Sequence, residues 1–349
     1  MHTDRRTLIA GAGALGATAL APWRAASAQS VQATGPVVRH SQRGFDNQRM
    51  PDLGNGTYLN PVISGDRPDP AILKNGGDYY VTFSSFDAYP GLTIWHSRDL
   101  VNWRPLKPAL HRNIGSVWAP GLHKDGGRYL LYIPVKAEPQ NDIYVSWADD
   151  IEGPWSDPVA LGLHHHIDPC HAVAEDGSKW LFLSGGDRVR LSDDNLSLAG
   201  EVEHVYDPWR YPSDWIVEGF SPEGPKIHHV GEWFYMITAV GGTAGPPTGH
   251  MVIAARSRSL HGPPDGSWWS LYHGFENGFW TLGRQCLLDP VRFTEDGWFE
   301  MTGGDLSQPI KKPGGGTSQP HGMALSDDFS GLLELGSKWA FFRPSADEA

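Results

Sequence analysis

The sequence predicts an all-β protein, a five-bladed β-propeller whose fifth blade is incomplete, and three observations indicate this class. The chain is rich in turn-forming and flat apolar residues, with 42 Gly, 28 Pro and 15 Trp among 349 residues. A glycine followed by an aromatic strand recurs about every 50 residues, with no helical period between the repeats. An acidic or small residue before a proline recurs at the same spacing. A β-sandwich is the alternative, but evenly spaced hairpins alone do not explain markers that recur in phase.

The predicted blades are counted from turn glycines that each precede a strand rich in aromatic residues. Successive glycines are separated by 50, 50, 54 and 35 residues. Short β segments at a period near 50 residues are typical of propeller blades, so five turns predict five blades. The five turn glycines are Gly77, Gly127, Gly177, Gly231 and Gly266.

The last and shortest interval predicts that the fifth blade lacks its channel-lining strand. After Gly262-Pro263 the turn at Asp265-Gly266 follows almost at once. In an earlier repeat an inner strand occupies this space, in the stretch from Pro154 to Gly177. Apolar faces left in water destabilise a fold, so either a segment such as Trp280 to Leu288 shifts into the vacancy or the fold is markedly unstable. We expect a three-stranded or distorted fifth blade.

Residues 1–28 are predicted to be an export signal and not part of the fold. Arg5 and Arg6 form a twin-arginine pair, an apolar stretch runs from Leu8 to about Leu20, and Ala26-Ser27-Ala28 supplies small residues for cleavage. A short anchor helix is the alternative, which the weak hydrophobicity of the Gly-rich stretch disfavours. Twin-arginine export predicts a periplasmic or secreted protein that leaves the membrane after cleavage.

The other boundaries follow from composition and from the repeats. Residues 29–54 are polar without periodicity and are interpreted as a linker or clasp, and residues 55–310 hold the propeller. Residues 311–349 are interpreted as a linker and the truncated start of an accessory β-sandwich, because so few residues cannot form a domain. We expect Cys170 and Cys286 to be buried free thiols, since one bridge would not make a disulfide framework in this chain.

The charge of the chain disfavours one class of partner. Lys and Arg number 28 against 40 Asp and Glu, and the formal net charge is −12. Nucleic-acid phosphates demand a basic face, so we expect no nucleic-acid partner.

Three of the markers before prolines carry carboxylates. Asp69 and Asp168 directly precede prolines, and Glu223 begins a Glu-Gly-Pro sequence. The innermost strands of a propeller start at one end of its channel, so these acids are expected to converge although about 50 residues separate them. Two carboxylates that flank an acetal oxygen are the groups that glycoside hydrolysis uses. The alternative is that each acid only shapes its turn.

These motifs, in this order, resemble glycoside hydrolase family 43 over about residues 58–302. The family consists of five-bladed propellers that cleave β-xylosides, α-L-arabinofuranosides and arabinans with inversion at the anomeric carbon. The resemblance therefore implies a glycosidase that acts on plant-derived oligosaccharides. The motifs that carry it are Asn60-Pro61-Val62, Asp66-Arg67-Pro68-Asp69-Pro70-Ala71, Ser116-Val117-Trp118-Ala119-Pro120, Ile167-Asp168-Pro169, Glu223-Gly224-Pro225, the run from Gly241 to Met251, and Leu282-Gly283-Arg284-Gln285.

The resemblance also implies a role for each acid. Asp69 would be the general base, Glu223 the general acid, and Asp168 the acid that orients Glu223 and raises its pKa. Inversion needs room for a water, so the carboxyls of Asp69 and Glu223 are expected roughly 6.5–9.5 Å apart. Glu218 is a rival for the acid, but only Glu223 has the Gly-Pro continuation at the correct offset before Gly231.

Three further side chains are candidate substrate-binding residues. Trp118 is expected to present a face to a sugar ring, Phe86 to wall the subsite, and Arg284 to donate to sugar hydroxyls. The alternatives are packing between blades for Trp118 and an inter-blade salt bridge for Arg284. The run His164-His165-His166 is assigned to a solvated loop and not to a metal site, because successive side chains of an extended segment point to opposite faces.

The incomplete fifth blade affects the expected cofactor and activity. In the family, the inner strand of that blade carries a Gly-His pair whose His often approaches a central calcium or water cluster. We expect no cofactor, and a central calcium is implied by the resemblance alone. Two function classes stay open: a pentoside-cleaving glycosidase and a catalytically weak sugar-binding propeller. A propeller glycosidase that acts on fructosides or sialosides is a more distant alternative.

Overall fold

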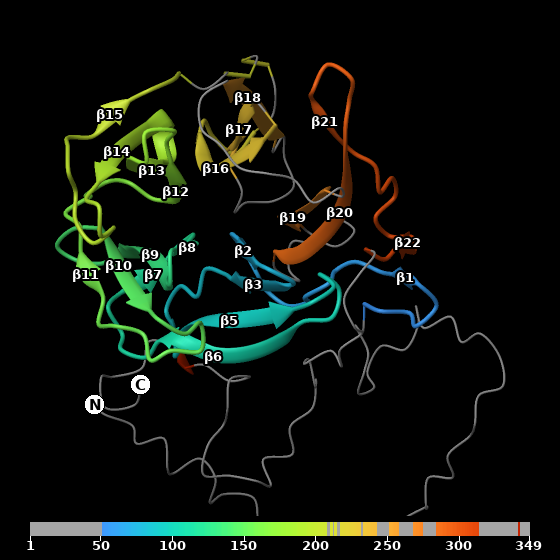
Figure 1. The fold of residues 1–349 in the computed structure, drawn as a ribbon, viewed down its shortest axis with the longest axis horizontal. Coiled ribbons are helices and arrows are strands. Elements are labelled where there is room, and N and C mark those ends of the chain that lie inside the picture. Colours follow the sequence, from blue (N-terminus) through green and yellow to red (C-terminus); the bar gives the residue numbers. More distant parts are fainter. Residues whose placement is uncertain are drawn as a thin grey trace, which may run out of the picture. The chain divides into compact units, whose positions relative to one another are not determined.

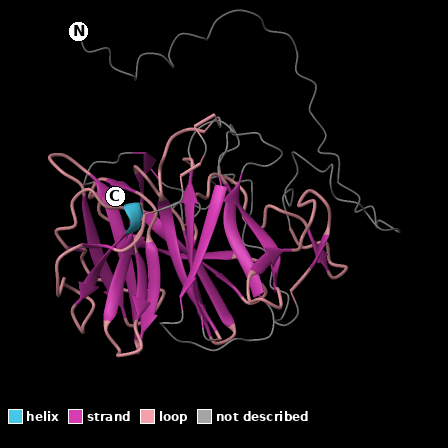
Figure 2. Cartoon of the chain, turned by 90° about the horizontal axis from the view of Figure 1, so that it is seen from above, coloured by secondary structure: helices cyan, strands magenta, loops and turns pink. Residues whose placement is uncertain are grey.

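The regular secondary structure of the described part of the chain consists almost entirely of β-strands (Figures 1 and 2). The computed structural model describes residues 51–207, 210–211, 213–214, 217–231, 233–242, 251–257, 268–274, 284–313 and 341–342. Within these ranges the one helical element is a 3-10 turn, η3 (Ser184–Gly186). No helix in the described ranges has the length and hydropathy that a membrane span requires. The predicted all-β class is confirmed.

Three antiparallel sheets follow one another in the first half of the described chain (Figure 1). The first sheet has the order β2 (Ala71–Asn75), β3 (Asp78–Thr82), β5 (Gly91–Ser97), β6 (Arg104–Leu110). In the second, β11 (Val159–Ala160), β10 (Asp142–Ala148) and β9 (Arg128–Lys136) are consecutive, and β7 (Ser116–Val117) and β8 (Gly121–Asp125) both pair with β9. The third has the order β12 (Cys170–Val173), β13 (Lys179–Leu183), β14 (Asp187–Leu191), β15 (Glu203–His204).

Two more sheets follow, each with three described strands. The fourth has the order β16 (Glu223–Val230), β17 (Trp233–Val240), β18 (Met251–Ser257). The fifth has the order β19 (Trp268–Gly274), β20 (Gln285–Phe293), β21 (Phe299–Met301). Successive antiparallel sheets built from hairpins form a β-propeller, as the repeats predict.

Turn glycines explain the hairpins that open these sheets. A left-handed φ favours glycine because it has no Cβ. Such glycines stand in the turns after β2, β8, β12 and β16, at Gly76, Gly126, Gly177 and Gly231.

The fifth sheet differs from the prediction in one turn and in the place of one segment. Gly266 lies outside the described residues, but Gly297, with φ 82°, closes the β20–β21 hairpin before an aromatic strand, and the sequence prediction overlooked it. Gln285 to Leu288 are not shifted into a vacancy. They form the start of β20, the central strand of the sheet, where Cys286 is paired with His273. Residues 280–283 lie outside the described ranges.

The core lies between sheets because strands such as β9 bury both faces. Leu131 packs toward the first sheet in a cluster with Ile94, and Leu130 packs toward the third sheet in a cluster with Leu181. All four side chains are fully buried. Burial of each leucine stabilises the fold by about 1.5–3 kcal/mol. The period-2 alternation of β9 therefore joins three consecutive sheets.

Two short pairings connect distant parts of the chain. The pairs are β1 (Thr57–Tyr58) with β22 (Ile310–Lys311) and β4 (Ala88–Tyr89) with β23 (Phe341–Phe342). Residues 1–50 and most of 311–349 lie outside the described ranges, so the predicted signal, linker and accessory segments remain predictions.

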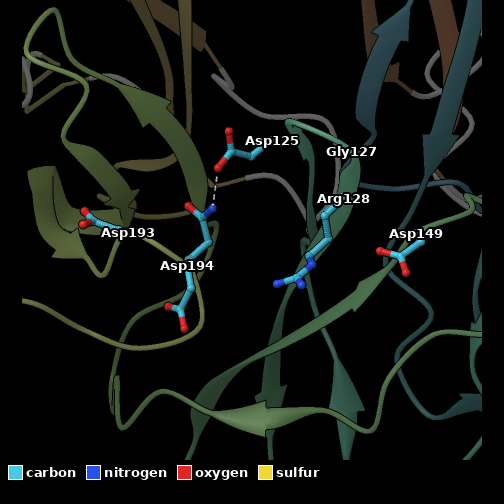
Figure 3. Close-up of a pocket in the computed structure, with 7 residues that line it drawn as sticks. Asp125, Gly127, Arg128, Asp149, Asp193 and Asp194 are labelled. Carbon is cyan, nitrogen blue, oxygen red and sulfur yellow. Dashed lines mark hydrogen bonds between the residues drawn. The ribbon is translucent and has the colours of Figure 1, made fainter.

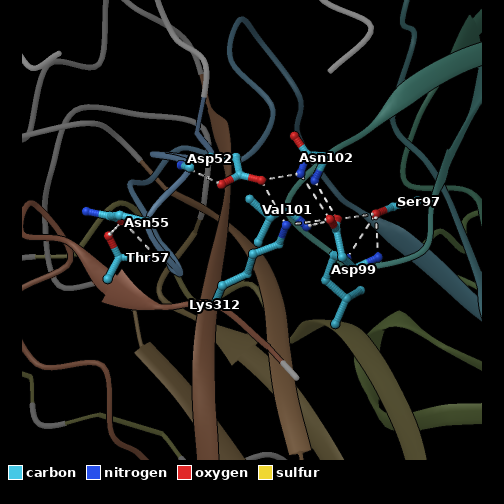
Figure 4. A network of polar contacts seen from close by, with 10 residues as sticks. Asp52, Asn55, Thr57, Ser97, Asp99, Val101, Asn102 and Lys312 are labelled. Carbon is cyan, nitrogen blue, oxygen red and sulfur yellow. Dashed lines mark hydrogen bonds and ion pairs between the residues drawn. The ribbon is translucent and has the colours of Figure 1, made fainter. Parts of the chain in front are cut away.

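A buried polar network fastens the β1–β22 pair to the first sheet (Figure 4). Asp52 accepts hydrogen bonds from Asn102, at 2.7 Å, and from the ammonium of Lys312, at 2.8 Å. Lys312 also pairs at 2.8 Å with Asp99, whose side chain is fully buried. Burial alone would lower the pKa of Lys312, but its bonds to the two carboxylates raise it. The network therefore ties residues from both ends of the described propeller together.

Candidate active site

One backbone conformation recurs where the inner strands begin. Asp69, Ala119 and Asp168 each precede a proline and have left-handed φ angles of 57°, 29° and 59°. Gly224, before Pro225, has φ 65°. The left-handed region is uncommon for residues other than glycine, and Asp is among those that tolerate it best. The marker before each proline is thus one turn repeated in four sheets. These four residues define what we call the mouth.

Glu223 occupies a different position in its turn from the two aspartates. Asp69 and Asp168 are themselves the left-handed residues, whereas in the fourth sheet glycine holds that place and the acid comes one residue earlier. The pairing of β16 with β17 is irregular between Glu223 and Lys226. The carboxyl of the fourth sheet therefore starts from another backbone position than those of the two aspartates.

The three carboxylates belong to one electrostatic cluster. Asp168 is buried, and its Oδ2 accepts a hydrogen bond from the Gly224 N–H at 2.8 Å. Burial, with the charge of Asp69 and then that of Glu223, raises the pKa of Asp168 to about 7, against the lowering effect of the Gly224 bond. Three sheets thus contribute acids that interact electrostatically although they lie far apart in sequence.

Asp69 is held by contacts from two other strand ends. The Ser84 hydroxyl, just after β3, donates to Asp69 Oδ2, and Arg284, just before β20, donates to Asp69 Oδ1 at 3.3 Å. The Arg284 backbone N–H donates at 2.8 Å to Asp66 Oδ1, and its carbonyl accepts from the Arg67 N–H. The inter-sheet salt bridge that was the alternative for Arg284 is present, and it places the guanidinium directly on the candidate base.

Phe86, Trp118 and Arg284 lie together beside Asp69. The Phe86 and Trp118 rings meet edge to face with centroids 6.0 Å apart, and the Arg284 guanidinium lies 5.7 Å from the Phe86 centroid. Phe86 and Val117 exchange backbone hydrogen bonds of 2.8 and 2.9 Å, which join the first and second sheets at this point. The Lys136 ammonium lies 3.8 Å from the centroid of the Trp118 ring. The three predicted binding residues therefore form one group of contacts, in which Arg284 touches the Asp69 carboxylate.

The histidine run is not wholly solvated, in contrast to the prediction. His165 is exposed, but His164 and His166 are partly buried. His164 Nδ1 lies 2.9 Å from the Asn141 carbonyl, while His166 Nε2 lies 3.1 Å from Asp187 Oδ2. These contacts anchor the loop that leads into Asp168.

The central calcium is implied by the resemblance alone. Calcium takes six to eight oxygen ligands in proteins. In the ranges that the structure describes, no group of three or more His, Cys, Asp or Glu is placed to hold a metal ion.

Cys170 and Cys286 are both free thiols, as expected, and only Cys286 is fully buried.

A polar pocket lies at the far end of β8 from the mouth (Figure 3). Its volume is about 420 Å³. Asp125, which accepts a hydrogen bond from Asn195 at 2.7 Å, marks the end of β8, whereas Ala119 of the mouth precedes its start. The lining residues are Asp125, Gly127, Arg128, Asp149, Asp193, Asp194 and Asn195.

The fold and the mouth define a class: a β-propeller with clustered carboxylates, an arginine and aromatic rings, the groups that sugar-cleaving sites use. Residues 58–264 match the model of glycosyl hydrolases family 43, and the chain belongs to this family. The predicted family is confirmed.

Named relatives and solved structures agree with this assignment. The chain is 28% identical to a non-reducing end α-L-arabinofuranosidase, BoGH43B, from Bacteroides ovatus, over 84% of this chain and 63% of that protein. It is 35% identical to a xylosidase/arabinosidase of Humicola insolens, over 58% of this chain and 41% of that protein. A mutant of the GH43 protein BlXynB from Bacillus licheniformis superposes with TM-score 0.68 at 26% identity, over 82% of this chain and 64% of that one. The chain thus spans less than two thirds of the length of these relatives.

Sequence reasoning missed Ser84 as a site residue. It stands two residues before Phe86, the only residue of the run Ser84-Ser85-Phe86 that was predicted to bind substrate. A polar residue at the end of the strand that follows an acidic turn was the available signal, because a β-hairpin returns to the level at which it began.

Proposed function

We propose that the protein is a glycosidase that hydrolyses β-xylosidic or α-L-arabinofuranosidic bonds of plant-derived oligosaccharides with inversion. Family membership and relatives named as xylosidases and arabinofuranosidases support this proposal. The observation that carries it is the electrostatic cluster of Asp69, Asp168 and Glu223, contributed by three separate sheets.

In this reaction Asp69 acts as the base. It takes a proton from a water whose oxygen attacks the anomeric carbon, as the bond from that carbon to the leaving oxygen breaks. Glu223 gives its proton to the leaving oxygen, so the products are a free sugar of inverted configuration and an alcohol. Arg284 pairs with one oxygen of Asp69 and so orients the carboxylate. Phe86 and Trp118 supply apolar contact for the sugar ring.

The raised pKa changes the role expected for Asp168. With a pKa of about 7, Asp168 is largely neutral below that pH, and it repels the proton-free form of Glu223 only when it is itself ionised. We propose that Asp168 supports Glu223 by orientation at acidic pH and also by charge above about pH 7.

Aryl β-xylosides and aryl α-L-arabinofuranosides test the function. Hydrolysis with the inverted anomer released, followed by proton NMR of the first product formed, supports it. Titration calorimetry with xylo- and arabino-oligosaccharides is run beside it. Binding without turnover of any pentoside would favour the second candidate, a catalytically weak sugar-binding propeller.

We propose five blades, with a fifth blade that lacks its inner strand. Five sheets with three or more described strands support the count. In the described part of the fifth sheet β19 is an edge strand, and Val252, on β18 of the preceding sheet, is 66% exposed. The lack of an inner strand in this blade is what favours the second candidate, the catalytically weak sugar-binding propeller. A family-like strand inserted between Pro263 and Asp265 should raise both the melting temperature and the turnover, and no rise in either would contradict the deletion.

We propose export through the twin-arginine route to the periplasm or the outside of the cell, where plant-derived oligosaccharides are met. A 24% identical relative from Cellvibrio japonicus is named as extracellular. Fractionation of cells that produce the full chain tests this. The Arg5→Lys, Arg6→Lys double variant should stay in the cytoplasm.

A further inference from the structure

Ser84 lies where the first sheet meets the second, directly on the candidate base. It follows β3, and its backbone N–H donates to the Pro68 carbonyl at 3.1 Å, which fixes it beside the turn that holds Asp69. Its side chain is largely buried, since the residue is 8% exposed. Water therefore competes weakly for the contacts of this hydroxyl.

The direction of the hydrogen bonds at Ser84 is determined by their chemistry. The Ala119 backbone N–H donates to Ser84 Oγ at 2.6 Å, so it occupies an acceptor site of that oxygen. A serine hydroxyl has one proton to give. That proton goes to Asp69 Oδ2, which is within hydrogen-bond distance of Oγ. A chain of donors thus runs from the backbone of the second sheet, through Ser84, to the carboxylate of the first.

The two oxygens of Asp69 are therefore held by different partners. Arg284 donates to Oδ1 and Ser84 donates to Oδ2, which together fix the rotation of the carboxylate about its Cβ–Cγ bond. A carboxylate oxygen can accept more than one hydrogen bond. Asp168 of the third sheet also faces Asp69, and it repels that carboxylate when it is itself ionised. Donors on both oxygens offset that repulsion.

We propose that Ser84 is a positioning residue for the base: it orients the Asp69 carboxylate, and it links that orientation to the second sheet through Ala119. The proposal rests on the proposed function for its kinetic consequence, while its effect on the carboxylate itself does not depend on turnover.

The test compares Ser84→Ala with two matched variants. Ser85→Ala removes the neighbouring hydroxyl, which has no hydrogen-bond partner among the described residues. Ser84→Thr keeps a hydroxyl at the proposed position. We expect Ser84→Ala to lower kcat about tenfold to a hundredfold with little change in KM, as the loss of one hydrogen bond to a charged group predicts. The acid limb of the pH profile of kcat should move to higher pH in Ser84→Ala, because a carboxylate that loses a hydrogen-bond donor binds protons more tightly.

Ser84→Thr should recover most of the wild-type kcat and acid limb, and Ser85→Ala should match wild type. Equal behaviour of Ser84→Ala and Ser85→Ala would overturn the proposal. So would a loss of activity in Ser84→Ala with an unchanged acid limb and a lowered melting temperature, which indicates a structural role alone.

A second readout separates this proposal from the proposed function. Carboxyl-carbon NMR of 13C-labelled protein, with the Asp69 signal assigned by its absence in Asp69→Asn, follows the carboxylate without substrate. In Ser84→Ala the signal should titrate at higher pH than in wild type and in Ser85→Ala. If wild type cleaves no pentoside but this difference is found, the function fails and the positioning role stands. If the signals titrate alike, the positioning role fails whatever the activity.

Discussion

The first sheet carries Asp69 and the fourth carries Glu223, and the two carboxylates are held in different ways. Asp69 accepts hydrogen bonds from two side chains: Ser84 donates to one carboxylate oxygen and Arg284 to the other. At Glu223 the defining features are in the backbone, where the β16–β17 register is irregular and the next residue, Gly224, donates its N–H to Asp168.

Packing differs between the same two sheets. Residues of β5, such as Ile94, are fully buried in clusters shared with the neighbouring sheets. In β16 only Pro225 is buried, and in β18 Val252 is largely exposed. Asp69, the candidate base, is thus held by side chains beside a densely buried sheet, whereas the turn of Glu223, the candidate acid, is held to the third sheet by backbone groups: the Gly185 N–H donates to the Pro222 carbonyl, and the Gly224 N–H donates to Asp168. Substitutions should therefore act on the two sides in different ways.

The largest effect is expected on the base side. Asp69→Asn removes the proton acceptor, and turnover should fall by about a thousandfold or more on every substrate, because the proposed mechanism has no second base to deprotonate the water. Steady-state kinetics with an aryl xyloside and a natural oligosaccharide measures this. A loss below tenfold on both substrates would show that another residue is the base.

On the acid side the effect should depend on the leaving group. Glu223→Gln should lose orders of magnitude on natural oligosaccharides but much less on aryl glycosides whose leaving groups have low pKa, because those need little protonation. The alkaline limb of its pH profile should vanish. Glu218→Gln, the rival acid, is the matched control and should keep that limb. Equal losses of Glu223→Gln on both substrates would argue against its role, and Asp168→Asn should lose less than either catalytic variant.

The packing contrast predicts a difference in stability. Leu131→Ala, in fully buried β9, should lower the free energy of unfolding by about 2–5 kcal/mol through lost burial and the cavity left behind. Val252→Ala, at a side chain that is 66% exposed, should change it by less than about 0.5 kcal/mol. Urea denaturation of both variants measures the difference. Similar changes would mean that Val252 is covered in solution.

The last prediction concerns the pH dependence of stability, where the change over one pH unit is small. The raised pKa of Asp168, about 7, means that the folded state binds this proton more tightly than the unfolded chain does. Its contribution to stability is complete below about pH 4 and is lost as the pH rises through about 7, with a slope of at most about 1.4 kcal/mol per pH unit.

Asp168→Asn should remove that slope, whereas Asp149→Asn, at an exposed carboxyl after β10, should retain it. Unfolding free energies measured between pH 4 and pH 8 decide this. A wild-type slope that survives in Asp168→Asn would assign the proton to another group.

Much of the fold could be predicted because its signals are local. A glycine in a left-handed turn and the alternation of strands such as β9 follow from steric constraints on a few neighbouring residues. The prediction was incomplete in the fifth sheet, where the turn at Gly297 was overlooked and Gln285 to Leu288 were expected to move. These residues pair with β19 across a long connection, and no local pattern specifies such a partner.

The sequence by itself determined the chemistry available at the mouth: acids or small residues before prolines, repeated at one spacing, and the family to which the chain belongs. Only the tertiary structure decided which groups act on which. Arg284 reaches Asp69 across 215 residues, and Ser84 reaches Ala119 of the next sheet. The raised pKa falls on Asp168 because it is buried beside two other acids. Turn conformations depend on neighbouring residues, whereas burial and charge depend on which sheets the fold brings together.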